Sequence, residues 1–292
     1  MAPFEVARPT SLAEAIGMLD PQDPDIRPVG GGTAIMLMMK AGVLRPTRLV
    51  FLQGLEREHS KLGVDADGNL HIGGLTRLAT LEHSAEVLTG WPVLARTLRS
   101  LSNVRVRNVA TLGGNLAHGD PHMDMPPLLS ALGAHVVISG PTHSRTVLVE
   151  DLCTGYYETV LARNELISEI VVPPQGERCA AYSKVTTRAA HDWPALGVAA
   201  VLDISGERVS NASLIVGAAT DRPTRLYEAE RALRGAAITD ARLREAGDSA
   251  AAELDIVGDS HGSASYKKQL LRVHVGRVVR RALETSTQRT YA

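Results

Sequence analysis

The sequence predicts an α+β fold in which two domains follow one another along the chain, and three observations lead to this prediction. Short β-branched runs alternate with helical segments in the first part of the chain. Three strand-like runs and then three helix-like runs make up the second part. Between the two parts, Pro173-Pro174 and Gln175-Gly176-Glu177 stop a strand pattern. We therefore expect one domain over residues 1–174, with subdomains at about 1–55 and 56–174, and a smaller domain over 178–285.

Composition and charge narrow the class of protein. With 292 residues, 44% of them hydrophobic and 22% charged, the chain can bury two cores and is not expected to be disordered. The formal net charge of −1 comes without a basic stripe, so charge gives no reason to expect binding to nucleic acid or an anionic membrane. No run is long enough to span a bilayer, and the first residues lack a basic leader, so no intrinsic membrane segment is expected.

The two cysteines, Cys153 and Cys179, are too far apart for a Cys-x-x-Cys pair. They are also too few for an iron–sulfur cluster, which normally takes four thiolates. Any such cluster that works with this chain must therefore lie on another chain. A cytoplasmic location is expected, and any association with a membrane would go through partner subunits.

The opening of the chain predicts a βαβ-like unit. Residues 4–6 read as a strand, and Ser11 caps a helix, with Glu14 completing a capping box, that ends at Asp20-Pro21. A strand over 26–29, a helix containing the apolar run 35–39 and a strand over 49–52 follow. The helix containing 35–39 is predicted to be buried, and its methionines are interpreted as core residues.

The elements up to the proline pair follow from turn signals and periodicity. Asp67-Gly68 predicts a hairpin between two strands within 62–74. Leu94, Leu98 and Leu101 form the apolar stripe of a helix, and residues 136–139, 146–149 and 166–172 are β-branched runs typical of strands.

Beyond the proline pair, residues 180–184, 195–204 and 209–216 predict an antiparallel three-stranded sheet with Gly206 in one turn. Residues 228–233, 241–254 and 266–283 have helical spacing and predict a helical bundle.

The run from 109 to 127 concentrates the candidate chemistry. It is predicted to be rich in turns and to end where a helix-like run over 128–134 begins. Gly113 and Gly114 lack Cβ atoms, so the backbone can take positive φ and bring N–H groups against a diphosphate. Thr111 and Asn115 flank them with short hydrogen-bonding side chains, and Asp124 offers an acceptor for sugar hydroxyls. The run is interpreted as a nucleotide clamp, with a simple tight turn as the alternative.

A second glycine run, residues 30–32, follows the predicted strand over 26–29 and precedes Thr33-Ala34-Ile35. Such a strand, turn and helix aims backbone donors and the positive end of a helix at phosphate. The run is neither Gly-x-Gly-x-x-Gly nor a phosphate-binding loop ending in Lys-Ser/Thr. Alone it is also compatible with a tight turn, but two such runs about eighty residues apart favour nucleotide binding.

Other polar residues are not assigned to chemistry. His118 and His122 lie four residues apart near Asp120 and Asp124, but a proline-rich loop lacks the fixed helical geometry that a metal site would need. No metal ligand is predicted. Arg105 and Arg107 could each reach a phosphate, although a solvated or structurally paired arginine is the preferred interpretation. No catalytic base and nucleophile pair is found.

The spacing of these motifs resembles a known family. Gly30-Gly31-Gly32-Thr33, then Arg107-Asn108, then Thr111-Leu112-Gly113-Gly114-Asn115 and Asp124 resemble the FAD-binding medium subunit of the molybdenum hydroxylases, which include aerobic carbon monoxide dehydrogenase and xanthine dehydrogenase. The segment 116–121 resembles the carbon monoxide dehydrogenase branch. The resemblance implies a two-subdomain FAD-binding domain like that of vanillyl-alcohol oxidase (the PCMH type), followed by a smaller carbon monoxide dehydrogenase flavoprotein-like domain.

The resemblance also implies partners and an activity. The working enzyme would have a large subunit with the molybdenum cofactor, a small subunit with two [2Fe–2S] clusters and this medium subunit, as a dimer of heterotrimers. Electrons would enter FAD from the small subunit and leave to an external acceptor. The chain would thus be an oxidoreductase subunit.

The same resemblance assigns residues to the cofactor. Lys184 would lie near the N1–C2 edge of the flavin and favour its anionic reduced form. Trp193 could cover one face of the ring, and Ile167 would pack against the cofactor. Ala34 and His191 depart from the family pattern. The residues expected to bind FAD are Val29, Gly30, Gly31, Gly32, Thr33, Ala34, Ile35, Leu101, Thr111, Gly113, Gly114, Asn115, Asp124, Ile167, Lys184 and Trp193.

Two alternative functions stay open at this point. One is a self-sufficient FAD-dependent oxidase or reductase, and the other is a scaffolding subunit that has lost FAD. The substrate of the partner subunit (carbon monoxide, an aldehyde or an N-heterocycle) and the final acceptor (oxygen, quinone or NAD) also stay open.

Overall fold

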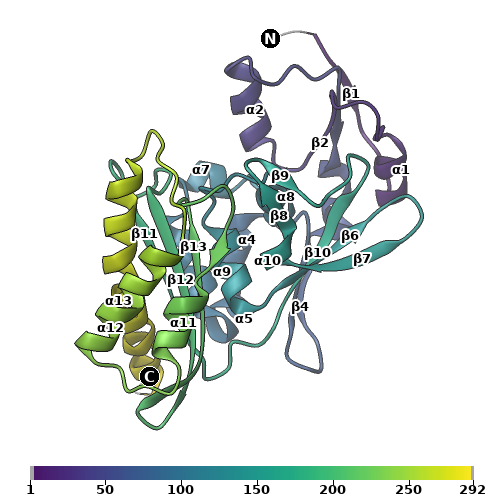
Figure 1. Ribbon diagram of the computed structural model, residues 1–292. Helices are drawn as coiled ribbons and strands as arrows, with labels where there is room; N and C mark the ends of the chain where they lie inside the picture. The colour runs from purple at the N-terminus through teal and green to yellow at the C-terminus, as the bar shows by residue number, and fades with distance from the viewer. Residues whose placement is uncertain (1–2, 291–292) are drawn as a thin grey trace.

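The computed structural model describes residues 3–290, with side chains to residue 285. The chain begins with a small lobe built on a parallel sheet of order β1-β3-β2, made of β1 (Glu5–Ala7), β3 (Arg48–Phe51) and β2 (Ile26–Val29) (Figure 1). Helix α1 (Leu12–Gly17) connects β1 to β2, and α2 (Thr33–Lys40) connects β2 to β3. This confirms the βαβ-like opening.

The start of α1 confirms Ser11 as the predicted N-cap but does not confirm the Glu14 contact of the predicted capping box. The Ser11 hydroxyl accepts a hydrogen bond from the Glu14 N–H at 3.1 Å. The Glu14 carboxylate accepts from the Thr10 N–H at 2.7 Å, one residue before the partner that a capping box predicts. The helix ends at Gly17, before the predicted Asp20-Pro21 stop.

The prediction that the helix containing residues 35–39 is buried is wrong. Helix α2 buries only Met39, and Leu37 is 55% exposed. Figure 1 shows α2 at the edge of the small lobe. Its other apolar side chains line a large cavity, and of these Ile35 also packs against the small core that contains Met39.

A mixed middle part follows, built on a five-stranded antiparallel sheet of order β4-β5-β10-β6-β7. Its strands are β4 (Leu62–Val64), β5 (Leu70–Gly73), β6 (His135–Ser139), β7 (Ser144–Leu148) and β10 (Leu166–Val172). The hairpin at Asp67-Gly68 is confirmed, with Gly68 at φ +82°.

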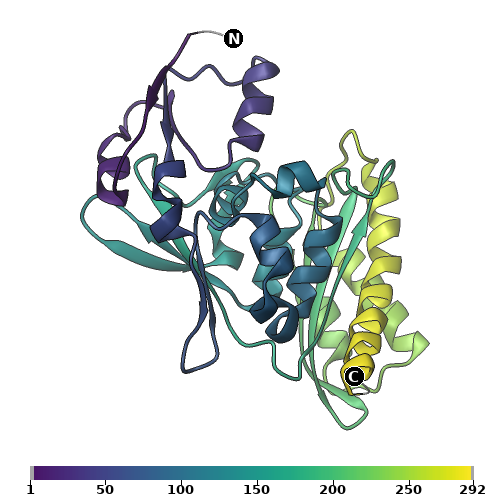
Figure 2. The ribbon, with the colours of Figure 1, turned by 180° about the vertical axis from the view of Figure 1, so that it is seen from behind.

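The helices of the middle part pack against this sheet and against one another (Figure 2). They are α4 (Leu78–His83), α5 (Ala85–Gly90), α6 (Pro92–Ser100), α7 (Val104–Arg107), α8 (Leu112–Ala117), α9 (Met125–Leu132) and α10 (Val149–Leu152). The remaining short elements are η1 (Leu52–Leu55), α3 (Glu56–His59), and the strand pair β8 (Cys153–Gly155) and β9 (Glu158–Thr159). The apolar stripe of Leu94, Leu98 and Leu101 is buried as predicted.

The last part is an antiparallel meander followed by helices, as predicted. Strands β11 (Cys179–Val185), β12 (Leu196–Ser205) and β13 (Arg208–Gly217) pair in order, with Gly206 at φ +59° in the turn. A two-residue strand, β14 (Thr224–Arg225), extends the expected three strands to four. Helices α11 (Tyr227–Leu233), α12 (Asp240–Glu253) and α13 (Ala264–Thr290) complete the fold.

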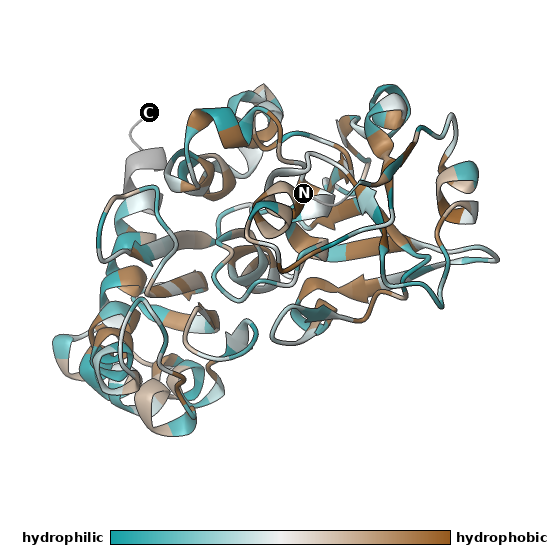
Figure 3. Cartoon of the chain, turned by 90° about the horizontal axis from the view of Figure 1, so that it is seen from above, coloured by the Kyte–Doolittle hydropathy of each residue, from teal (hydrophilic) through white to brown (hydrophobic). Residues whose placement is uncertain are grey.

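The sheet of the last part is apolar on both faces. One face, with Ala180, Tyr182 and Ala199, belongs to the core that also contains α6 and α9. The other face, with Ala181, Val198 and the neighbouring strands, packs on α11, α12 and α13. Hydrophobic residues accordingly concentrate on the central strands in Figure 3. This packing brings β11, and with it Lys184, to the middle part of the chain.

Candidate functional site

The two glycine runs lie against each other. A Cβ added to Gly30 would lie 2.6 Å from the Thr111 hydroxyl oxygen. A Cβ added to Gly31 would collide with the backbone carbonyl of Val109. Segments about eighty residues apart in the sequence therefore form one surface, and glycine is required where their backbones meet.

The first run opens the N-terminus of α2 towards the cavity. Gly32 is the N-cap residue in a left-handed conformation, φ +71°, and no side chain caps the helix there. The N–H groups of Thr33, Ala34 and Ile35 have no partner among the described residues, and the first backbone bond of the helix is Met36 N–H to Gly32. An uncapped helix N-terminus is a site for phosphate.

The second run differs from its prediction. Gly113 and Gly114 do not take positive φ, because they form the first turn of α8, and the predicted turn-rich run also holds the start of α9 at Met125. The Gly113 N–H donates to the Gly74 carbonyl at 2.9 Å, and the Gly114 N–H donates to the Thr111 hydroxyl at 3.2 Å. These donors are therefore used inside the protein. Gly113 instead allows close packing, since a Cβ there would lie 2.6 Å from the Gly74 carbonyl oxygen.

The side chain of Asn115 supplies the polar group that the second run presents to the cavity. Its Nδ2 donates to the Met123 sulfur at 3.1 Å. Its Oδ1 is buried and has no hydrogen-bond partner among the described residues. A buried polar atom without a partner costs about 1–3 kcal/mol, so this atom is a strong candidate for a ligand contact.

The cavity that these elements line has a volume of about 1280 Å³. This exceeds the roughly 300–1,000 Å³ of typical small-molecule pockets and suits an extended dinucleotide. Its walls include 15 of the 16 residues predicted to bind FAD. The exception is Val29, which is 3% exposed and packs with Met39 and Leu49 in a small core.

Asp124 and Lys184 form a buried ion pair at the wall of the cavity. The Lys184 Nζ lies 2.9 Å from Asp124 Oδ2 and also donates to the Ser100 carbonyl at 3.2 Å. The Tyr182 hydroxyl donates to Asp124 Oδ1 at 2.9 Å. The missing Cβ of Gly197 makes room for this hydroxyl. The carboxylate thus links strand β11 to the start of α9.

Burial dominates the electrostatics of this pair. It raises the pKa of the Asp124 carboxyl, while Lys184 and Tyr182 act in the opposite direction. Burial also raises the pKa of the Tyr182 hydroxyl, and the nearby Asp124 adds to the effect. Asp124 was expected to accept from sugar hydroxyls, and both of its oxygens already accept from the protein. Its first role is to hold Lys184 in place.

The remaining predicted residues also reach the cavity. Ile167 and Leu101 are buried in its wall, and Trp193 is 44% exposed at the wall. Ala34 and His191, which depart from the family pattern, line it as well.

Several residues that line the cavity, or that contact its wall from behind as Tyr182 does, were not predicted from the sequence. Tyr182 lies two positions before Lys184 on β11, so the alternation of a strand could have placed both side chains on one face. Arg27, with a buried Nε that has no partner among the described residues, lines the cavity together with Arg163. Tyr157 lines it with a strained backbone at φ +59°, and nothing in the local sequence signals this conformation.

The residues that were not assigned to chemistry are mostly structural. Arg107 forms a buried ion pair with Glu82, Nε to Oε2 at 2.7 Å, which confirms the preferred interpretation of this arginine. Among the described residues, no group of three or more His, Cys, Asp or Glu is arranged to hold a metal ion. Over the same part of the chain, the helices are too short or too polar to cross a membrane.

Comparisons with known proteins match nearly the whole chain. Residues 2–175 match the family of the FAD binding domain in molybdopterin dehydrogenase, and residues 180–282 match the CO dehydrogenase flavoprotein C-terminal domain. The carbon monoxide dehydrogenase medium chain of Hydrogenophaga pseudoflava is 32% identical over 98% of this chain and 98% of its own length. The glyceraldehyde dehydrogenase medium chain of Sulfolobus acidocaldarius is 29% identical over 92% of this chain and 95% of its own.

Solved structures of related enzymes have the same fold as this chain. A carbon monoxide dehydrogenase structure from Hydrogenophaga pseudoflava superposes with a TM-score of 0.92 at 32% identity, over 97% of this chain and 99% of that one. Quinoline 2-oxidoreductase from Pseudomonas putida 86 superposes with a TM-score of 0.91 at 27% identity, over 98% of both chains. Fold and matches together define an FAD-binding oxidoreductase subunit. The chain belongs to the molybdenum hydroxylase family, as its FAD-binding medium subunit.

The partnerless oxygen of Asn115 leads to a first prediction. Asn115→Ala removes one polar partner and should weaken FAD binding by about 0.5–1.5 kcal/mol. Titration of the apo chain with FAD, followed by flavin fluorescence, measures the change. Asn108→Ala, at an exposed asparagine that does not line the cavity, is the matched control and should bind as wild type. Equal affinities in the two variants would contradict the assignment.

Proposed function

We propose that FAD lies in this cavity with its diphosphate at the glycine run before α2 and one of its hydroxyls at Asn115 Oδ1. The observation that carries the proposal is that backbone donors and a side-chain acceptor without hydrogen-bond partners lie close together at the cavity. The three partnerless N–H groups of Thr33, Ala34 and Ile35 directly follow the first glycine run, and the partnerless Asn115 Oδ1 directly follows the second run, which packs against the first. The donors match the charge of a diphosphate, while Asn115 Oδ1 can accept from a hydroxyl.

The chain's own residues then position the flavin. Lys184 is held by Asp124 and Ser100, so its ammonium has a fixed place in the cavity wall. We assign this ammonium to the pyrimidine edge of the flavin and Trp193 to one face of the ring. Bound FAD would supply the capacity to take up and release electrons, which no side chain of this chain provides.

We further propose that the chain works between two partner subunits. A small subunit with two [2Fe–2S] clusters would deliver electrons, and a large molybdenum-cofactor subunit would oxidise the substrate, in a dimer of heterotrimers. Relatives named as medium chains or medium subunits support this arrangement. Their names specify carbon monoxide, glyceraldehyde and nicotine at 29–32% identity, so the medium chain does not identify the substrate.

The isolated chain should bind FAD without a covalent bond. The cavity offers hydrogen-bond partners for FAD, and no sequence motif indicates a histidine or cysteine that would be covalently attached to the flavin. The loaded chain should be yellow, and acid precipitation should release the flavin into the supernatant. Flavin that stays with the pellet would contradict this prediction. A colourless chain that cannot be loaded would favour the scaffolding alternative.

Turnover separates the proposed role from a self-sufficient oxidase. The FAD-loaded chain alone should show no turnover with carbon monoxide, aldehydes or N-heterocycles and an artificial acceptor. Adding the small and large subunits should produce it. Turnover by the chain alone would overturn the proposed function.

A further inference from the structure

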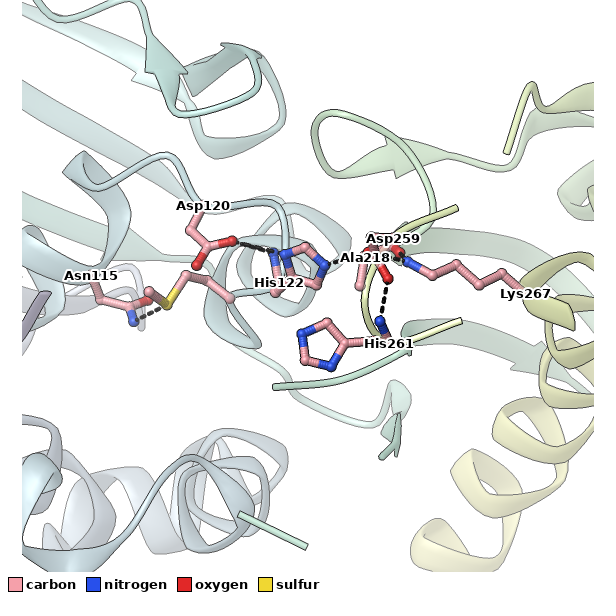
Figure 4. Close-up of polar contacts among 8 residues, drawn as sticks. Asn115, Asp120, His122, Ala218, Asp259, His261 and Lys267 are labelled. Carbon is pink, nitrogen blue, oxygen red and sulfur yellow. Dashed lines mark hydrogen bonds and ion pairs between the residues drawn. The ribbon is translucent and has the colours of Figure 1, made fainter. Parts of the chain in front are cut away.

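A row of alternating charges joins the cavity wall to the last part of the chain. Asp120 and His122 lie on the loop between α8 and α9. Figure 4 shows that they face Asp259, on the loop before α13, and Lys267, on α13 itself. This row is separate from the Asp124–Lys184 pair. It uses residues that the FAD assignment did not absorb.

The contacts in the row are short. His122 Nδ1 lies 3.0 Å from Asp120 Oδ1, and His122 Nε2 lies 2.8 Å from Asp259 Oδ2. Lys267 Nζ donates to the same Asp259 oxygen at 2.5 Å and to the Ala218 carbonyl at 2.5 Å. The His122 side chain is 11% exposed, so solvent screens these contacts little.

Both ring nitrogens of His122 face a carboxylate oxygen. A neutral imidazole carries one N–H and can donate to only one of the two, whereas the imidazolium donates to both. Burial would lower the pKa of His122, but the hydrogen bonds to Asp120 and Asp259 outweigh it and raise the pKa above its ordinary value. The protonated ring is therefore the form that this geometry favours.

The other titratable groups around the row are few. The His261 ring lies 5.2 Å from the His122 ring, and its side chain forms no contact with either carboxylate among the described residues. His118 and Tyr157 face Asp120 from the cavity side. Lys267 faces Asp259 and is fully buried. Among the described residues, the ion-pair partners of the two carboxylates are therefore His122, which contacts both, and Lys267, which contacts only Asp259.

The position of the row connects it to the cofactor. Asp120, His122 and Asp124 line the cavity from one loop, while Lys184 and Trp193 line it from the last part of the chain. When the ring loses its proton, one of its two links opens, and the loop is then held less firmly against Asp259.

We propose that His122 is a positioning residue whose imidazolium fixes the cavity loop, residues 118–124, to the last part of the chain, so that FAD binds more tightly when the ring is protonated. This inference rests on the proposed function. The sign follows from the raised pKa of His122: the link is fully present below the unfolded value of about 6.5 and is lost as pH rises through the folded pKa. FAD affinity should fall over the same range.

The first experiment is FAD titration of the apo chain between pH 6 and pH 9. We expect the wild-type dissociation constant to rise about tenfold through the pKa of His122, the effect of about one charge-assisted hydrogen bond. The His122→Gln variant should bind FAD more weakly than the wild type at low pH, and its dissociation constant should be nearly independent of pH. The control His261→Gln should follow the wild type. A wild-type profile as flat as that of His122→Gln would overturn the inference.

The second experiment does not depend on a variant folding. If FAD binds the protonated ring more tightly, linkage requires that bound FAD increases the proton affinity of His122 by the same factor. A tenfold effect on FAD affinity therefore corresponds to a rise of about one unit in the pKa of His122. Histidine ¹⁵N shifts of the apo and FAD-loaded chain measure this pKa. An unchanged pKa would overturn the inference while leaving the proposed function intact. Failure to bind FAD at any pH would overturn both.

Discussion

Gly31→Ala should abolish FAD occupancy and lower the free energy of unfolding by about 1–3 kcal/mol. The added Cβ collides with the backbone carbonyl of Val109, and a backbone atom cannot move aside as a flexible side chain can. The two glycine runs are then forced apart at the place where the diphosphate is proposed to lie. Flavin absorbance after reconstitution and urea denaturation measure the two effects.

Two comparisons make this result specific. Gly17→Ala is the matched control, since a Cβ at Gly17 meets no atom within 4 Å, and it should keep full FAD occupancy. Gly114→Val places a Cβ 2.9 Å from the Thr111 hydroxyl and fills part of the cavity, so it should lower FAD content more than Asn115→Ala does. Full occupancy in Gly31→Ala and Gly114→Val would mean that the glycine runs are misassigned.

Lys184→Met should destabilise the chain by about 3–5 kcal/mol, because it leaves the Asp124 carboxylate buried without its cation. The two side chains are 7% and 4% exposed, so solvent cannot replace the lost partner. In the folded fraction FAD should stay bound, and its midpoint potential should become more negative, since the balancing positive charge is gone. Denaturation and a redox titration test the two parts separately.

The double variant Asp124→Asn/Lys184→Met removes both charges and should recover most of the lost stability. Arg107→Met breaks a different buried ion pair, with Glu82, and should lower stability without shifting the flavin potential. If Lys184→Met has the potential of the wild type, then Lys184 does not lie near the flavin. If the single and double variants are equally unstable, the ion pair is not the cause.

Local patterns were sufficient to predict much of the fold. The hairpin at Asp67-Gly68, the meander turn at Gly206 and the cap at Ser11 each depend on residues within a few positions of one another. Helix α8 was missed because Gly113 and Gly114 have low helix propensity. Its first turn is held by Thr111 and by the Gly74 carbonyl, a contact between segments far apart in sequence.

The burial of α2 could not be predicted for a different reason. An apolar helix that faces a core and one that faces a cofactor cavity have the same sequence pattern, so Leu37 and Met36 gave no sign of their exposure.

Pairings at the site also lie beyond local patterns. The motifs identified both Asp124 and Lys184, but not that they form an ion pair across 60 positions. The contact between His122 and Asp259 spans 137 positions. Such contacts depend on how the sheet of the last part packs against α6 and α9, which no single segment encodes.

The most direct test of the central claim is an experimental structure of the chain with FAD bound. We predict density for the diphosphate within hydrogen-bonding distance of the N–H groups of Thr33, Ala34 and Ile35, with a cofactor hydroxyl facing Asn115 Oδ1 and the flavin ring beside Lys184. Density for FAD elsewhere on the chain, or an empty cavity in crystals that keep their flavin absorbance, would contradict the account.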